Sequence, residues 1–155
     1  MSVKYELRCV ATVVVISTMS LICACASASA LDDSPTALAA LQAKADQAQP
    51  KDKCFLYAKL VSRMMDLAGH QLNSGDSGQA SETLKLVQQY AEKIHVGVAD
   101  DSKKLRDAEL LMQRTTFRLQ DILSQASYED RQTLEATLKQ LSQVQAQLMM
   151  QVFKK

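Results

Sequence analysis

The middle of the chain carries a long series of apolar residues that alternate at steps of four and three. This spacing is typical of a helix that buries one face against neighbouring helices. The series comprises Ala80, Leu84, Val87, Ala91, Ile94, Val98, Leu105, Ala108, Met112, Leu119, Ile122 and Ala126, and only Asp101 and Thr115 interrupt it. It predicts one long helix of coiled-coil type over residues 78–125, which would extend for about 72 Å at 1.5 Å per residue.

Polar residues inside this series allow a second interpretation. Gly97, Asp100 and Asp101 fall within the apolar pattern, and a kink near Asp100 would fold the two halves into a more compact bundle. We favour the continuous helix, because the apolar spacing keeps its register on both sides of the polar step.

Helix-start and helix-stop signals divide the part that precedes the long helix. Ser34 is a good N-cap and Pro35 is tolerated in a first turn, so a short Ala-rich helix is expected over residues 35–49. Pro50 ends it, and a second helix follows over 51–73. The inner face of this second helix repeats at Cys54, Tyr57, Val61, Met64, Ala68 and Leu72. Residues 73–76, which include Gly75, are a turn signal.

A capping box marks the start of the last helix. Ser127 and Asp130 are three residues apart, so that the serine side chain can accept the Asp130 N–H. The last helix is expected over 129–153, with Leu134, Leu138, Leu141, Leu148 and Val152 on its inner face. No segment has a competing strand pattern, so the predicted fold class is all-α.

The predicted arrangement is an antiparallel helical bundle built around the long helix. The helix over 51–73 packs along the first half of the long helix, and the helix over 129–153 packs along its second half. These two would meet end to end near Gly97. There they would leave an apolar groove for a partner helix or a small apolar ligand.

The first 30 residues have the pattern of a secretory signal peptide. Lys4 and Arg8 precede a charge-free apolar run over 9–25, and residues 28–30 read Ala-Ser-Ala. We expect cleavage after Ala30, a single helical domain over 31–155, and export to the periplasm or outside the cell. An uncleaved membrane anchor is one alternative, although it usually needs about 20 apolar residues. Lipoprotein processing at Cys25 is another.

Charge and cysteine content narrow the class of protein. Of 18 Lys and Arg, Lys4 and Arg8 leave with the leader, and of 17 Asp and Glu, Glu6 leaves, so 16 of each sign remain. Such a balance gives no basic stripe for nucleic acid. Cys54 is the one cysteine after residue 30, so no disulfide can form within that part of the chain.

The first expected hairpin resembles a tetratricopeptide repeat. Over residues 64–87, Leu67 and Ala68 precede Leu72, and Ala80 and Leu84 follow Gly75, at the spacing of that repeat. No second copy follows at a period near 34, which a solenoid would require. The chain after residue 30 is also similar to uncharacterised exported helical proteins of bacteria, a family without an assigned activity. The hairpin resemblance implies protein interaction.

Histidine and cysteine are the candidates for catalytic or metal-binding groups. The chain contains His70 and His95 alone, without a haem-attachment or zinc-helix motif. The predicted hairpin brings Cys54 level with His95, and such a pair can activate a thiol. Cys54 also belongs to an apolar stripe, where free cysteine is usually a buried core residue. We therefore expect no catalytic, cofactor-binding or metal-ligating residue.

Methionine side chains are candidate ligands for a copper site, because thioethers suit Cu(I). The candidates are Met64, Met65, Met112, Met149 and Met150. In the predicted arrangement Met64 and Met149 lie roughly 27 Å apart along the long helix. We interpret all five as core residues.

These observations favour a non-enzymatic interaction protein of the cell envelope, such as an adaptor, a scaffold or a chaperone-like bundle. Its partner is expected to be a protein, either a different one or a second copy of the chain in a homo-oligomer. Neither nucleic acid nor, once the leader is removed, a membrane is expected as a partner. A periplasmic carrier of a small ligand or metal is the alternative.

Overall fold

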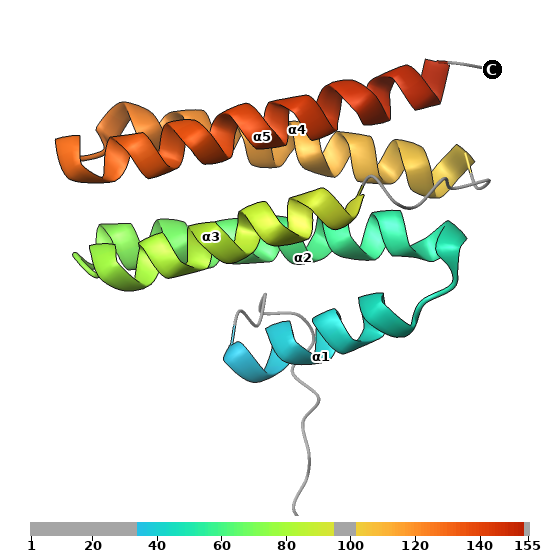
Figure 1. Ribbon diagram of the computed structural model, residues 1–155, viewed down its shortest axis with the longest axis horizontal. Helices are drawn as coiled ribbons and strands as arrows, with labels where there is room; N and C mark the ends of the chain where they lie inside the picture. The colour runs from blue at the N-terminus through green and yellow to red at the C-terminus, as the bar shows by residue number, and fades with distance from the viewer. Residues whose placement is uncertain (1–33, 95–101, 154–155) are drawn as a thin grey trace, which may run out of the picture. The chain divides into compact units, whose positions relative to one another are not determined.

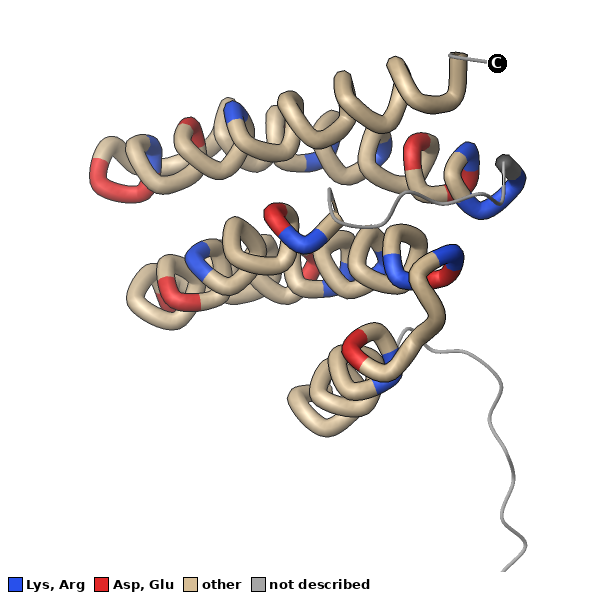
Figure 2. The backbone as a smooth tube through the Cα atoms, turned by 45° about the vertical axis from the view of Figure 1, so that its right-hand side comes forward, with Lys and Arg blue, Asp and Glu red and all other residues tan. Residues whose placement is uncertain are grey.

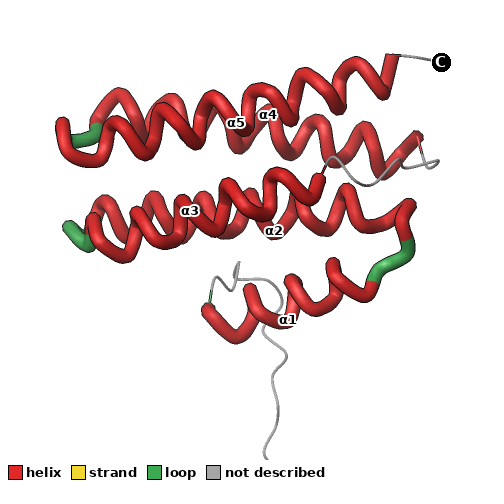
Figure 3. Tube along the Cα trace, viewed as in Figure 1, coloured by secondary structure: helices red, strands yellow, loops and turns green. Residues whose placement is uncertain are grey.

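The computed structural model describes residues 34–94 and 102–153, which form helices joined by short turns (Figures 1 and 3). The helices are α1 (Pro35–Gln47), α2 (Pro50–Asn73), α3 (Ser77–Ile94), α4 (Ser102–Gln125) and α5 (Tyr128–Phe153). No strand occurs in these two ranges. The predicted all-α class is therefore confirmed, and the expected bounds of α1, α2 and α5 hold to within two residues.

Local capping explains where α1 and α5 begin. The Ser34 hydroxyl accepts a hydrogen bond from the N–H of Ala37 at 3.2 Å, and Pro35 follows in the first turn. The Ser127 hydroxyl accepts the N–H of Asp130 at 3.2 Å and donates to its Oδ2 at 2.7 Å. Both contacts satisfy N–H groups that lack a partner within the helix.

A glycine turn joins α2 and α3 into a hairpin. Gly75 has φ +84°, a left-handed conformation that favours glycine. The N–H groups of Gly75 and Asp76 donate to the carbonyls of Leu72 and Gln71 at 3.1 and 2.8 Å. Further along, Thr83 Oγ1 donates to Gln71 Oε1 at 2.8 Å. The two helices therefore run antiparallel, as the sequence predicts.

The prediction of one continuous helix over 78–125 is wrong, because α3 and α4 run in opposite directions. Ion pairs join Lys104 to Asp52 and Arg118 to Asp66, so residue numbers increase in the same direction along α2 and α4. Since α3 is antiparallel to α2, it is also antiparallel to α4. Gly97, Val98, Asp100 and Asp101, on which the two interpretations differed, lie outside the described residues.

The four longer helices form a bundle in which consecutive α3 and α4 occupy opposite corners. α2 packs against α3 and α4, and α5 packs against the same two helices. In the described residues α3 does not pack against α4, nor α2 against α5. α1 packs on α2. The predicted groove near Gly97 is therefore wrong, because α2 and α5 do not meet end to end.

Polar contacts fix the parallel pairing of α3 with α5. Gln88 Nε2 donates to Thr137 Oγ1 at 2.8 Å, and Gln140 Nε2 donates to the carbonyl of Gln88 at 2.9 Å. Thr137 in turn donates to the carbonyl of Thr133. At the start of these helices Ser77 donates to Asp130 at 3.2 Å. Hydrogen bonds of defined direction hold a register that apolar contacts alone leave loose.

The core is one apolar cluster that draws on all five helices. Its largest fully buried side chains include Leu60, Met65, Leu84, Ile94, Met112, Leu119, Leu134 and Leu141. Leu105 is buried as predicted, and so are Met64, Met65 and Met112. The same prediction is wrong for Met149 and Met150, which are 41% and 59% exposed. Among the described helices, none is long and apolar enough to cross a membrane.

Candidate interaction groove between α2 and α4

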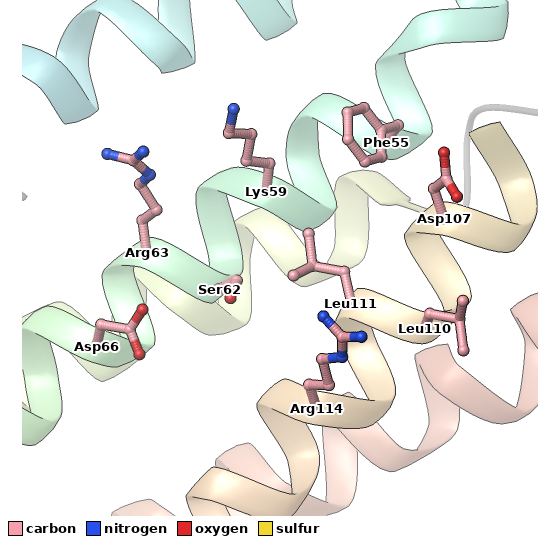
Figure 4. Close-up of a pocket in the computed structure, with 9 residues that line it drawn as sticks. All are labelled: Phe55, Lys59, Ser62, Arg63, Asp66, Asp107, Leu110, Leu111 and Arg114. Atoms are coloured by element: carbon pink, nitrogen blue, oxygen red, sulfur yellow. The ribbon is translucent and has the colours of Figure 1, made fainter. Parts of the chain in front are cut away.

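A groove of about 460 Å³ lies between α2 and α4 (Figure 4). Both helices contribute to it, and we call it the α2–α4 groove. It is lined by Phe55, Lys59, Ser62, Arg63 and Asp66 from α2 and by Asp107, Leu110, Leu111 and Arg114 from α4.

The groove exists because its residues lie beside the apolar stripe of each helix rather than on it. Phe55 and Leu111 are half-buried and pack against the core cluster, so they form an apolar base. Leu110 is 42% exposed at the side of the groove. Ser62 is small and half-buried at its centre, which leaves space between the two helices (Figure 4).

Positive charge predominates around this apolar base. The lining contains three cations, Lys59, Arg63 and Arg114, and two carboxylates, those of Asp66 and Asp107. Asp66 is engaged by an ion pair with Arg118. Within the described part of the chain, Lys59 and Arg114 form no ion pair. A guanidinium presents two parallel N–H donors that match a carboxylate, so Arg114 is suited to an acidic group of a ligand.

Two further hollows continue the α2–α4 groove towards the turns that join the helices. A second hollow of about 470 Å³ is lined by Met65, Asp66, Gly69, His70, Asn73, Arg118 and Ile122. A third, of about 520 Å³, includes the carboxylates of Asp121, Glu129 and Asp130. The surface therefore changes from basic to acidic along one direction.

The structure does not support an activated thiol at Cys54. This side chain is only 1% exposed, and burial raises the pKa of its thiol to about 11. A raised pKa keeps the thiol protonated and unreactive at neutral pH. His95 lies outside the described residues, and the other histidine, His70, is exposed beside the second hollow.

A separate polar cluster joins α1 to α2 and α3. The Tyr57 hydroxyl donates to Asp46 Oδ1 at 2.5 Å, and Lys93 Nζ lies 3.7 Å from the same oxygen. Lys93 Nζ also stands 5.5 Å and 5.1 Å from the ring centres of Tyr57 and Tyr90, in cation–π geometry. The two rings are stacked with centres 6.3 Å apart.

The ionisation of this cluster reflects the same contacts. Burial, followed by the hydrogen bond to Asp46, raises the pKa of Tyr57 to about 12. Burial also raises the pKa of Tyr90. The hydrogen bond from Tyr57 lowers the pKa of Asp46, and Lys93 acts in the same direction. The cluster thus holds Asp46 charged and both tyrosines neutral, which suits a contact that docks α1.

Sequence reasoning did not identify the residues of the α2–α4 groove. The signal that could have indicated the groove is the presence of three apolar residues, Phe55, Leu110 and Leu111, outside the apolar series that forms the inner face of each helix. Among the described residues, no group of three or more His, Cys, Asp or Glu is placed to hold a metal ion.

Comparison with known proteins identifies no relative of the chain. No protein-family model, no curated protein and no solved structure matches the chain. The similarity to exported helical proteins and the tetratricopeptide-like spacing over 64–87 therefore stay predictions.

Proposed function

We propose that this chain is an exported, non-enzymatic interaction protein of the cell envelope, whose α2–α4 groove binds an amphipathic, acidic segment of a partner protein. One observation carries the proposal: the groove combines an apolar base with Lys59 and Arg114, two cations that form no ion pair with any described residue. Apolar side chains of the partner would pack on Phe55, Leu110 and Leu111, and its carboxylates would meet Lys59 and Arg114.

The balance of charge supports an acidic partner over a basic one. Of the two groove carboxylates, Asp66 is engaged by Arg118. Complementary charge accelerates encounter and discourages wrong partners, while the buried apolar contacts hold the complex.

Site-specific photo-cross-linking tests the proposal. A photo-reactive benzoylphenylalanine is placed at Leu110, in the groove, or at Phe117, seven residues further along α4 and 60% exposed outside it. We expect one discrete protein adduct from position 110 and little adduct from position 117. The yield of the adduct at position 110 should decrease at least fivefold when Arg114→Glu is added. Equal adducts from both positions, or an adduct insensitive to Arg114→Glu, would contradict the proposal.

A small-ligand carrier is the second candidate, because about 460 Å³ lies within the usual range for small-molecule pockets. The same experiment separates the two functions. A carrier would give an adduct of a few hundred daltons at position 110, as measured by intact-protein mass spectrometry, in place of a protein-sized one.

Export itself has a direct test. The pattern of residues 4–30 supports cleavage after Ala30, so protein recovered from the cell envelope should begin at Leu31. A lipid on Cys25, or an intact Met1, would show that the leader is processed differently or retained.

A further inference from the structure

The last turn of α5 exposes a cluster of large apolar side chains. Met149, Met150 and Phe153 are 41%, 59% and 78% exposed, and all three lie within the final five residues of the helix. Scattered exposed apolar residues are ordinary, but a contiguous group at one helix end usually marks a contact surface.

Basic residues gather at the same end of the bundle. α4 begins there because it is antiparallel to α5, and α2 begins there because Asp52 pairs with Lys104. Residues 51–53 and 103–107 carry five cations (Lys51, Lys53, Lys103, Lys104 and Arg106) against Asp52 and Asp107 (Figure 2).

The opposite end, where the hairpins turn, has the opposite charge. Residues 73–77 and 121–131 carry four carboxylates, those of Asp76, Asp121, Glu129 and Asp130, against Arg131 alone (Figure 2). The bundle therefore has a basic end and an acidic end, and the exposed apolar cluster belongs to the basic one.

We propose that this basic end binds the surface of an anionic phospholipid bilayer, with Met150 and Phe153 entering its outer layer. Anionic headgroups attract a basic surface, and apolar side chains beside it gain free energy by leaving water for the acyl boundary. The attraction orients the molecule, because the acidic end is repelled. The bundle stays folded on the surface and does not span the membrane.

This inference goes beyond the proposed function and departs from the expectation of no membrane contact after leader removal. Met149 and Met150, which the sequence led us to expect in the core, are exposed instead. The α2–α4 groove shares only Asp107 with the basic end, and the variants expected to lose binding in the two tests lie at different residues, so each proposal can fail without the other.

Flotation with lipid vesicles tests the proposal. The probes are vesicles of phosphatidylcholine alone, and of phosphatidylcholine with 30% phosphatidylglycerol, at low and at physiological salt. All variants share one N-terminus, fixed by mass spectrometry, because an uncleaved apolar run over 9–25 would itself bind lipid. We expect binding to the anionic vesicles that weakens with salt, and little binding to the neutral ones.

Matched variants locate the contact. Met150→Ser with Phe153→Ser should reduce anionic-vesicle binding at least fivefold, whereas Phe117→Ser, a comparably exposed phenylalanine elsewhere, should leave it within twofold. Arg106→Glu at the basic end should reduce binding, and Arg131→Glu at the acidic end should not. Circular dichroism checks that each variant keeps its helices.

Two results would overturn the proposal. One is equal binding by the end variants and their controls. The other is concentration-dependent dimerisation, measured by sedimentation, that disappears in Met150→Ser with Phe153→Ser while vesicles remain unbound. That second result would assign the exposed cluster to another copy of the chain.

Discussion

Gly69 of α2 lies against Ile122 of α4, so closely that a Cβ atom at position 69 would stand 3.1 Å from the Cδ1 atom of Ile122. This distance is tighter than ordinary van der Waals contact. Glycine is usually unfavourable inside a helix by about 1 kcal/mol relative to alanine. Its place in the last two turns of α2 therefore reflects the close approach of α4 beside the second hollow.

Substitution of Gly69 should reveal this approach. Gly69→Ala should be nearly neutral, because a gain of helix propensity of up to about 1 kcal/mol is offset by displacement of Ile122. Gly69→Leu should destabilise by about 1–3 kcal/mol through overpacking. Gly78→Ala is the matched control, since nothing lies within 4 Å of a Cβ there, and it should stabilise. Urea denaturation measures all three, and a stabilised Gly69→Leu would refute the close packing.

A disulfide between α2 and α4 tests the reversal of direction between α3 and α4. In a Cys54→Ala background, Asp66→Cys with Arg118→Cys replaces an ion pair and should cross-link rapidly under mild oxidation. With one continuous helix over 78–125, residue 118 would lie about 50 Å from the level of residue 66, at 1.5 Å per residue. Mobility on non-reducing gels gives the answer. Asp66→Cys with Arg106→Cys, a pair separated along the bundle, should not cross-link.

The Cys54 thiol should be unreactive in the folded protein. Its pKa of about 11 and its 1% exposure both reduce access to the thiolate. We expect labelling by a maleimide at neutral pH to be slower than in denaturant by a factor of about 100 or more. Cys54→Ala should lower stability by about 1 kcal/mol, less than the truncation of larger core residues. Fast native labelling, or a reducible dimer band that Cys54→Ala abolishes, would show an accessible thiol.

Docking of α1 should depend on pH through Asp46. The pKa of Asp46 is lower in the folded protein, mainly through the hydrogen bond from Tyr57. The stabilisation from charged Asp46 is fully present at a pH above 3.8, the ordinary pKa of an aspartate. It is lost as the pH falls through the lower pKa that Asp46 has in the folded protein. Hydrogen exchange of α1 amides should therefore accelerate in acid. The other groups of the cluster are Lys53 and Tyr57 on α2 and Tyr90 and Lys93 on α3.

Asp46→Asn separates this effect from general acid unfolding. It should accelerate exchange in α1 at neutral pH while leaving α5 protected, and it should reduce the acid dependence of α1. Asp76→Asn, a carboxylate in the distant α2–α3 turn, is the control. If α1 exchanges at the wild-type rate in Asp46→Asn, then its apolar contacts through Leu38 and Ala45 suffice to dock it.

The sequence predicted the helices well because their signals are local. Ser34, Gly75 and Ser127 act within a few residues of themselves, and each has the capping or turn contact expected of it. The apolar spacing identified buried positions correctly from Ala80 to Ile94 on α3 and from Leu105 to Leu119 on α4. Ile122 and Ala126 are half-buried, and Val98 lies outside the described residues. The spacing gave no information about direction, because two helices that bury the same kind of stripe produce the same spacing whether they are joined or reversed.

The candidate sites could not be predicted from the sequence, because they depend on which helices lie side by side. Lys59 and Arg114 have the pattern of solvated outward residues until α2 and α4 are brought side by side. Met149 continues the spacing of Leu141 and Leu148 closely enough to be taken for core. It is exposed because α3, which runs parallel to α5, ends at Ile94 and does not reach the last turns of α5.

The diagonal placement of α3 and α4 has a consequence for how fast the chain folds. α2 with α3, and α4 with α5, are each joined by a short turn, so each hairpin can form through contacts close in sequence. The pairings of α2 with α4 and of α3 with α5 join residues about 50 positions apart, as in Lys104 with Asp52 and Gln88 with Thr137. Loop closure over such separations slows the search for native contacts. Hairpin formation should therefore precede a slower docking step, and substitutions at Thr137 should slow folding more than those at Gly75.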